Sequence, residues 1–495
     1  MPRNTFVALC GFLLLPWFLW AQKPHFEWNA EVDRAHDLVL QFRMSEAEKV
    51  LIELNERFPE NRAVDYVWTD LYLIRTLVEE HDEHRAELYE SYRDHLNRFF
   101  DLEKTSVWRS VVLGETYFKR GLVNTLNGNP LSAARDIYLG YQQFERAYEL
   151  DSTFYPALLG WGVVQMYAGA IPDDYVWYAR LIGISGDSEF GERLIIKAVE
   201  ESQGATKNSF HITHIPFTAN YLSIGQEIPS HRKSLKSKGK NSYPLILFAE
   251  VKNLVDDHNN VEAMSLLSQY RPTPDQMRFW YLDYLYGINL VRVNDPKGEK
   301  VLLNYLANYP GDSYKKSAAL FLSWYYLMNG KEEESRYYKN RIDDLGKAFA
   351  GADKEAMNLK DVDVPIALLR ARLLFDSGEY EAADSVLRST PPESFEKDID
   401  RQNWYYRNGQ VHKALGDLEV ARRFYQRVTE LPFDTSRKFT PASCMEIGNI
   451  YFERQQYNEA IKWYDKALEY KGYPYVSDYR RLANRRREQA EEKLP

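Results

Sequence analysis

Two histidine pairs are the residues of this chain whose spacing suits a metal site. His211 and His214 stand three positions apart, as do His81 and His84, and such a spacing can place two imidazoles on one metal ion. No cysteine lies near either pair, and neither belongs to an HExxH motif. Residues 213–216 indicate a helix end or a loop, and the second pair lies in a charge-rich helix. We therefore expect no metal and no cofactor.

Other features could support catalysis or phosphate binding. Asp173 and Asp174 are typical of the first turn of a helix, and without a partner residue they do not indicate acid–base chemistry. The glycine-rich segment 183–191 could cradle a phosphate, but no strand precedes it and no Lys-Ser/Thr follows directly. The glycines instead suit a sharp turn, in which Ser185 or Asp187 can cap the next helix. No nucleophile elbow occurs, so the sequence favours a protein that is not an enzyme.

The elements that position these residues are helical hairpins, and residues 448–467 contain the most complete one. Small and large residues alternate there, in the order Gly448, Tyr451, Ala460, Tyr464 and Ala467. Gly448 allows the first helix to approach the second closely, and Tyr464 fills the space between them. Asn458 and Glu459 suit the start of the second helix. This order is the tetratricopeptide repeat (TPR) pattern, a helix-turn-helix unit.

Weaker copies of the hairpin pattern occur along the chain. They begin near residues 35, 287, 326, 371 and 409, and most end at a proline just past the second helix. One such unit cannot bury its apolar face alone, so the copies must stack on one another. We therefore predict an all-α fold, a TPR-type α-solenoid of antiparallel helical hairpins in two lobes.

Composition agrees with a helical repeat protein. The chain has 495 residues, 44% of them hydrophobic and 27% charged, and it lacks the valine-isoleucine runs of buried parallel strands. Aromatic residues make up 14%, including 36 tyrosines, and most should fill the space between helices. Some could line a concave face, where a peptide or a glycan would bind. Cys444 lies within an expected helix and is interpreted as a small core residue.

The first 21 residues have the pattern of a secretory signal peptide. Arg3 precedes an apolar run from residue 6 to residue 20, and Ala21 offers a cleavage site. The run is short for a membrane span, although an uncleaved anchor is the alternative. No Asn-x-Ser/Thr acceptor occurs, which favours a bacterial envelope. We expect an exported protein, periplasmic or outer-membrane-associated if bacterial.

Charge and breaker residues suggest the domain boundaries. The net charge is −9, so the sequence predicts no nucleic-acid partner. Residues 229–242 form a basic linker or loop, or else a docking strip for anionic lipid that would give peripheral membrane association. This stretch separates an N-terminal helical lobe, residues 22–228, from a C-terminal TPR array with a capping helix, residues 243–495.

A block of motifs in the N-terminal lobe resembles one family. Residues 131–135 read Leu-Ser-Ala-Ala-Arg, Gly140 and Tyr141 follow, and residues 183–191 complete the series. This order resembles the tetratricopeptide repeat protein 39 family, which includes the inclusion-body clearance protein; Ile184 replaces its usual Phe and Ser188 its usual Arg. The resemblance implies an α-helical adaptor without catalytic residues. Members of that family face the cytosol or the mitochondrial surface, and the signal peptide departs from this.

The function that the sequence favours is that of an exported scaffold or adaptor for envelope assembly or homeostasis. It would bind a partner protein or peptide in a concave groove lined by the first helix of each hairpin. Arg407 and Asn449 are expected to be exposed on such first helices and are the predicted binding residues. The alternative is a glycan-binding envelope protein of a nutrient-uptake system. The sequence does not predict an oligomeric state.

Overall fold

The computed structural model describes residues 23–169, 183–201, 243–348 and 350–494. Several sequence predictions fall outside these ranges and stay predictions. They are the signal peptide (residues 1–21), the carboxylates Asp173 and Asp174, the histidines His211 and His214, and the basic linker (residues 229–242).

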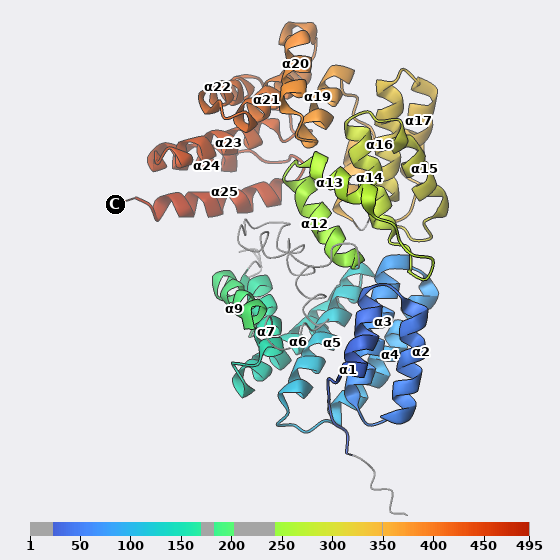
Figure 1. Ribbon diagram of the computed structural model, residues 1–495. Helices are drawn as coiled ribbons and strands as arrows, with labels where there is room; N and C mark the ends of the chain where they lie inside the picture. Colours follow the sequence, from blue (N-terminus) through green and yellow to red (C-terminus); the bar gives the residue numbers. More distant parts are fainter. Residues whose placement is uncertain (1–22, 170–182, 202–242, 349, 495) are drawn as a thin grey trace, which may run out of the picture.

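Antiparallel helical hairpins make up the N-terminal part of the chain (Figure 1). The hairpins are α1 (Ala30–Leu40) with α2 (Met44–Arg57), α3 (Arg62–Glu79) with α4 (Asp82–Phe100), α5 (Val107–Leu126) with α6 (Pro130–Leu150), and α7 (Tyr155–Gly169) with α9 (Ser188–Glu201). The described residues contain one isolated β-bridge, between His25 and Asn61, and no strand.

The C-terminal part continues the same architecture. Its hairpins are α12 (Pro244–Asp256) with α13 (Asn260–Gln269), α14 (Trp280–Arg292) with α15 (Lys297–Asn308), α16 (Lys315–Met328) with α17 (Glu332–Arg341), α19 (Ile366–Asp376) with α20 (Tyr380–Ser389), α21 (Asp398–Ala414) with α22 (Leu418–Glu430), and α23 (Phe439–Glu453) with α24 (Tyr457–Glu469). A single helix, α18 (Gly351–Leu359), precedes α19, and α25 (Val476–Glu491) ends the described chain. The hairpins predicted from the weaker copies are therefore confirmed.

One turn geometry recurs between the helices of most hairpins. In each of these hairpins, a residue with φ between +57° and +88° follows the first helix. These residues are Phe42, Gly128, His258, Asn294, Gly330, Gly378, Gly416 and Gln455. The next backbone N–H then donates to a carbonyl five residues earlier, as Asp417 does to His412 at 2.8 Å. This Schellman geometry satisfies carbonyls at the end of the first helix and reverses the chain at once.

Small residues bring the two helices of a hairpin together, as the sequence predicts. A Cβ atom on Gly448 would lie 2.5 Å from Cε1 of Tyr464, and one on Gly409 would lie 2.5 Å from Cε1 of Tyr425. Both tyrosines are buried. The start of the last hairpin's second helix differs slightly from the prediction, because α24 begins at Tyr457 and no side chain caps it.

One hydrophobic cluster joins the two predicted lobes. A single cluster of buried side chains runs from α1–α3 into α12–α16, and it includes the contact of Phe42 with Phe279. Hydrogen bonds add to this junction, because the Glu80 carboxylate accepts from the Tyr281 hydroxyl and from the backbone N–H groups of Asp312 and Ser313. The C-terminal lobe is thereby fixed on the end of the first two hairpins.

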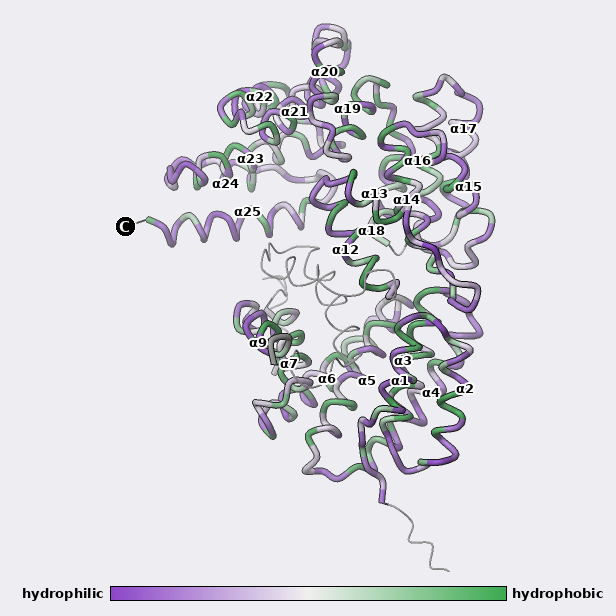
Figure 2. Tube along the Cα trace, in the orientation of Figure 1, coloured by the Kyte–Doolittle hydropathy of each residue, from purple (hydrophilic) through white to green (hydrophobic). Residues whose placement is uncertain are grey.

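The last helix and the outer surfaces are polar. Figure 2 shows that α25 is hydrophilic over most of its length, and its buried residues are the small Ala483 and Ala490. It packs against α23 and α24, so its apolar stripe covers the end of the array. Among the described residues, no helix combines the length and the apolar character that a membrane crossing requires.

Candidate protein-binding face

The first helices of the C-terminal hairpins form the inner side of the solenoid. Helices α19, α21 and α23 contact one another in order, and α25 contacts α23. Within the described chain the second helices α20, α22 and α24 contact neighbouring first helices but make no comparable contact with one another. Because the first helices lie closer together, the array curves towards them. We call the surface of α19, α21, α23 and α25 the inner face (Figure 1).

Arg407, a predicted binding residue, lies on α21 at this inner face. The prediction that it is exposed is wrong, because the side chain is half-buried. Its guanidinium donates to Asn403 at 3.3 Å and to Gln410 at 2.7 Å, and both acceptors are neutral amides. Burial lowers the pKa of Arg407, and the nearby charge of Arg372 lowers it further. In the described part of the chain no carboxylate forms an ion pair with this guanidinium.

Lys438, at the start of α23, is a second cation of the inner face. Its ammonium lies 5.5 Å from the ring centre of Tyr475 and 5.3 Å from that of Tyr479, both from the region of α25. Burial lowers the pKa of Lys438 as well, although Glu355 acts in the opposite direction. Among the described residues it has aromatic neighbours and no carboxylate within ion-pair distance.

Arg372 completes this group, which we call the cation cluster: Arg372, Arg407 and Lys438. Arg372 differs from the other two because its guanidinium donates to Glu355 at 2.6 Å and lies 3.6 Å from Asp376. Burial opposes its charge, but these two carboxylates outweigh burial and raise the pKa of Arg372. The cation cluster therefore has one cation that is ion-paired among the described residues, whereas Glu355 and Asp376 act on Arg407 and Lys438 only from beyond ion-pair distance.

Tyrosine side chains surround the cation cluster. Tyr406 lies under Arg407, with its ring centre 5.7 Å from the guanidinium, and Tyr475 is exposed. The amide of Asn358, on α18, donates to the Tyr475 hydroxyl at 3.2 Å. That contact brings α18 and the start of α25 together across the inner face. The arrangement offers cations and phenol rings to a segment bound there.

Asn449 lies on α23, the predicted first helix, but its surroundings differ from the prediction. It is half-buried rather than exposed, and its amide oxygen accepts a hydrogen bond from the Tyr464 hydroxyl at 3.0 Å. The side chain therefore helps to orient the ring that fills the hairpin. Contact of Asn449 or of Arg407 with a partner stays a prediction.

The other residues considered for chemistry have structural surroundings. Cys444 is fully buried, and burial raises the pKa of its thiol to about 12, so the expected core role is confirmed. Asp187 caps α9, because its carboxylate accepts from the backbone N–H of Phe190 at 2.9 Å. The rings of His81 and His84 lie 5.7 Å apart, and His84 is 2.8 Å from Glu79. No group of metal-ligating side chains suited to hold an ion occurs among the described residues.

Sequence reasoning missed two features of the structure. Lys438 was missed because it lies just outside the helix that it precedes, and only the helix register would have placed it on the inner face. A pocket between α2, α3 and α4 was missed because its residues come from three helices. The signal for it was the spacing of Asp65, Trp68 and Tyr72, which puts them on one side of α3.

Comparison with known families supports the repeat architecture. A family model described as "Tetratricopeptide repeat" matches residues 405–435, and a second described as "TPR repeat" matches residues 448–471. These ranges cover the hairpins α21–α22 and most of α23–α24. No curated protein matches the chain significantly in sequence.

Solved helical-repeat structures are distantly similar to the chain. The APC/C hetero-tetramer Cut9–Hcn1 is 16% identical, with 93% of this chain and 85% of that chain covered and a TM-score of 0.25. Yeast Tom70 is 10% identical, with 94% and 88% covered and a TM-score of 0.24. The P58(IPK) TPR domain is 15% identical, with 84% and 99% covered and a TM-score of 0.20. These likenesses are too distant to support any statement about function. From its own hairpins and the matched repeats, the chain is an all-α solenoid that contains tetratricopeptide repeats.

Proposed function

We propose that this protein is an exported scaffold that binds a partner protein or peptide on the inner face, in the assembly or homeostasis of a cell envelope. The observation that supports the site is the cation cluster, in which Arg407 and Lys438 have no carboxylate partner among the described residues. Two half-buried positive charges cost free energy unless an anion lies close to them. Glu355 and Asp376 act on both charges but already pair with Arg372, so a further anion would reduce this cost. A bound acidic segment would supply that anion.

The chemistry of the inner face favours a peptide with aspartate or glutamate side chains, or with a free terminal carboxylate. A carboxylate next to Arg407 forms charge-assisted hydrogen bonds, which are about twice as strong as neutral ones. The neighbouring tyrosines add apolar contact area and a hydroxyl that can bond to a peptide backbone. Acidic side chains would therefore set specificity, and the phenol rings would bind whatever residues lie between them.

The export part of this proposal rests on residues 1–21. Their short positive start, apolar run and small residue at the end are those of a secretory signal. The motifs at residues 131–135 and 183–191 suggest in addition an adaptor related to the tetratricopeptide repeat protein 39 family. Location in the envelope would then be a departure of this chain from that family.

Copurification from the native envelope tests the proposal. We expect the wild-type protein to retain a partner protein in the presence of a chelator and without added cofactor. The double variant Arg407→Ser/Lys438→Ser should lose that partner. The double variant Arg423→Ser/Lys462→Ser removes the same charge from exposed positions on α22 and α24, and it should keep the partner.

Two results would contradict the proposal. One is equal retention of the partner by both double variants, which would place the contact elsewhere. The other is the absence of any copurifying protein together with a rise in melting temperature on adding oligosaccharides that Arg407→Ser/Lys438→Ser abolishes, which would place a glycan on the inner face. A ligand that binds only the folded state stabilises it, so this second result would favour the glycan-binding alternative.

A further inference from the structure

A small pocket lies between α2, α3 and α4, in the N-terminal lobe and apart from the inner face. Its volume is about 360 Å³, which falls within the range of roughly 300–1,000 Å³ of small-molecule sites. It is lined by Ile52, Asn55 and Glu56 of α2, Asp65, Trp68 and Tyr72 of α3, and His95 and Arg98 of α4. Nothing in the scaffold function uses these residues.

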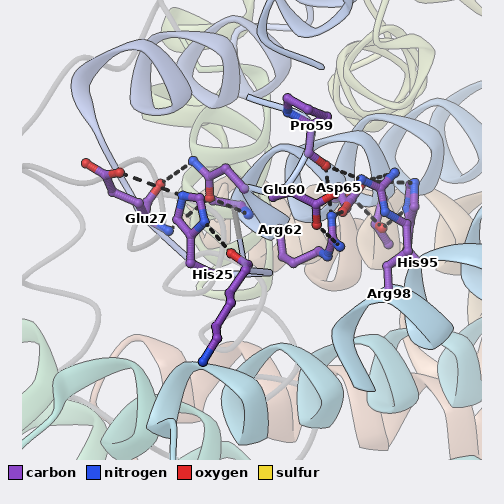
Figure 3. A network of polar contacts seen from close by, with 12 residues as sticks. His25, Glu27, Pro59, Glu60, Arg62, Asp65, His95 and Arg98 are labelled. Carbon is purple, nitrogen blue, oxygen red and sulfur yellow. Dashed lines mark hydrogen bonds and ion pairs between the residues drawn. The ribbon is translucent and has the colours of Figure 1, made fainter. Parts of the chain in front are cut away.

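Asp65 is the buried carboxylate of this lining. Its residue is 1% exposed, and the carboxylate forms an ion pair of 2.9 Å with Arg98 (Figure 3). Its second oxygen, Oδ2, accepts no hydrogen bond from any described residue, and Nη1 of Arg62 is 3.8 Å away from it. A buried acceptor without a donor is rare in folded proteins, because it loses its hydrogen bonds to water on folding. Oδ2 is itself sealed from solvent and Arg62 is not part of the lining, so Asp65 positions Arg98 through their ion pair and does not bond to a ligand.

His95 lies beside Asp65 without adding charge. Its Nδ1 is 2.7 Å from the Thr69 hydroxyl and 2.9 Å from the Ser91 hydroxyl, and its Nε2 is 3.9 Å from Oδ1 of Asp65. Burial lowers the pKa of His95 to about 4, with a further contribution from Arg98. The imidazole is therefore neutral at pH 7, and it contributes an uncharged polar ring to the lining of the pocket.

Aromatic and amide groups complete the pocket. The rings of Trp68 and Tyr72 are stacked, with centres 5.5 Å apart and planes at 21°, and both side chains are half-buried. Asn55 and Glu56 are exposed on α2. An Asn amide can both donate and accept, and a Glu carboxylate can accept. The pocket therefore combines aromatic surface with several polar groups of both kinds.

This combination excludes strongly charged ligands and points to a neutral one. Glu56 disfavours an anion and Arg98 disfavours a cation, so the charged groups of the lining oppose each other. A sugar ring has hydroxyls that both donate and accept, and its C–H face packs on aromatic rings. We propose that this pocket is a binding site for a saccharide unit, with Asn55 and Glu56 bonding its hydroxyls and Trp68 or Tyr72 packing on its ring.

Saturation-transfer NMR on the full-length chain tests this site. The probes are N-acetylglucosamine, cellobiose and methyl glucoside, with inorganic phosphate and butylammonium as anion and cation probes. We expect saturable binding of at least one sugar with a millimolar dissociation constant and weaker or no binding of the ions. The variant Asn55→Ala/Glu56→Gln changes exposed positions only, so it should fold, and it should weaken sugar binding about ten-fold.

A matched control and a second variant make the test specific. Glu53→Gln, also exposed on α2 but outside the pocket, should bind like the parent. Trp68→Leu removes aromatic surface from the pocket, and it should lose binding while its circular dichroism spectrum stays helical. No saturable sugar binding, equal binding by the double variant and the parent, or tighter binding of phosphate or butylammonium would each overturn the proposal. Partner capture through the cation cluster is measured separately, so the two proposals can fail independently.

Discussion

Asp65 and His95 belong to one buried polar network, yet burial moves their pKa values in opposite directions. Burial raises the pKa of Asp65 to about 7, although Arg98 and Arg62 act to lower it, and burial lowers the pKa of His95 to about 4. Between pH 4 and 7 the folded state holds a proton on Asp65 that the unfolded chain releases, so the free energy of unfolding falls as pH rises. Between pH 4 and 6.5 the unfolded chain protonates the histidine, so His95 contributes the opposite slope.

The opposing slopes give a prediction for Asp65→Asn. The variant loses the contribution that falls with pH, so its free energy of unfolding relative to the parent should rise by about 2–4 kcal/mol between pH 4 and 7. Urea denaturation at several pH values measures this difference. The variant His95→Gln should show the opposite trend between pH 4 and 6.5. A difference for Asp65→Asn that does not change with pH would show that the carboxylate titrates normally.

Close packing at Gly448 gives a second prediction at this scale. Its substitution by Ala puts a methyl group into the ring of Tyr464, which is fully buried. We expect a loss of about 1–3 kcal/mol, measured by thermal or urea denaturation. Gly351→Ala, at the start of α18 with no atom within 4 Å of the new methyl, is the control and should cost nothing. Equal melting of the two variants would mean that the hairpin is packed more loosely than described.

At the scale of the element, the hairpin turns depend on backbone conformation more than on side-chain contacts. Gly416 has φ +88°, and no atom lies within 4 Å of the position that a Cβ would take, so only the backbone makes glycine favourable there. Gly416→Ala should therefore cost about 1–2 kcal/mol. Gln455 occupies the same position in the next hairpin with φ +59°, and Gln455→Gly should cause no comparable loss. Urea denaturation measures the free energy of unfolding of both variants. Unchanged stability of Gly416→Ala would contradict the role given to the turn.

The hairpins themselves could be predicted from the sequence because their signals are local. Gly448, Ala460 and Tyr464 fall within one unit, and each interacts with a residue nearby in the chain. The site could be predicted only in part, because its polar contacts join separate hairpins. Arg407 was placed on the correct type of helix, but the charges that act on it include Arg372 and Lys438, which come from neighbouring hairpins. Such contacts have no signal in a single repeat.

At the scale of the whole molecule, one core joins both lobes while the two proposed sites lie on different elements. The cluster from α1–α3 to α12–α16 means that the lobes cannot be treated as independent modules. The cation cluster lies on α19–α23, and the pocket lies on α2–α4. A scaffold of this design could hold an acidic partner segment at one end and a saccharide unit at the other.

The measurement that tests the central claim most directly is a peptide titration at two salt concentrations. Labelled peptides rich in glutamate, and the same peptides with glutamine in place of glutamate, are added to the full-length protein and followed by fluorescence anisotropy. We expect only the glutamate peptides to bind, with affinity that falls as salt rises and that drops about ten-fold or more in Arg407→Ser/Lys438→Ser. Equal binding of both peptides, or unchanged affinity in that variant, would contradict the account.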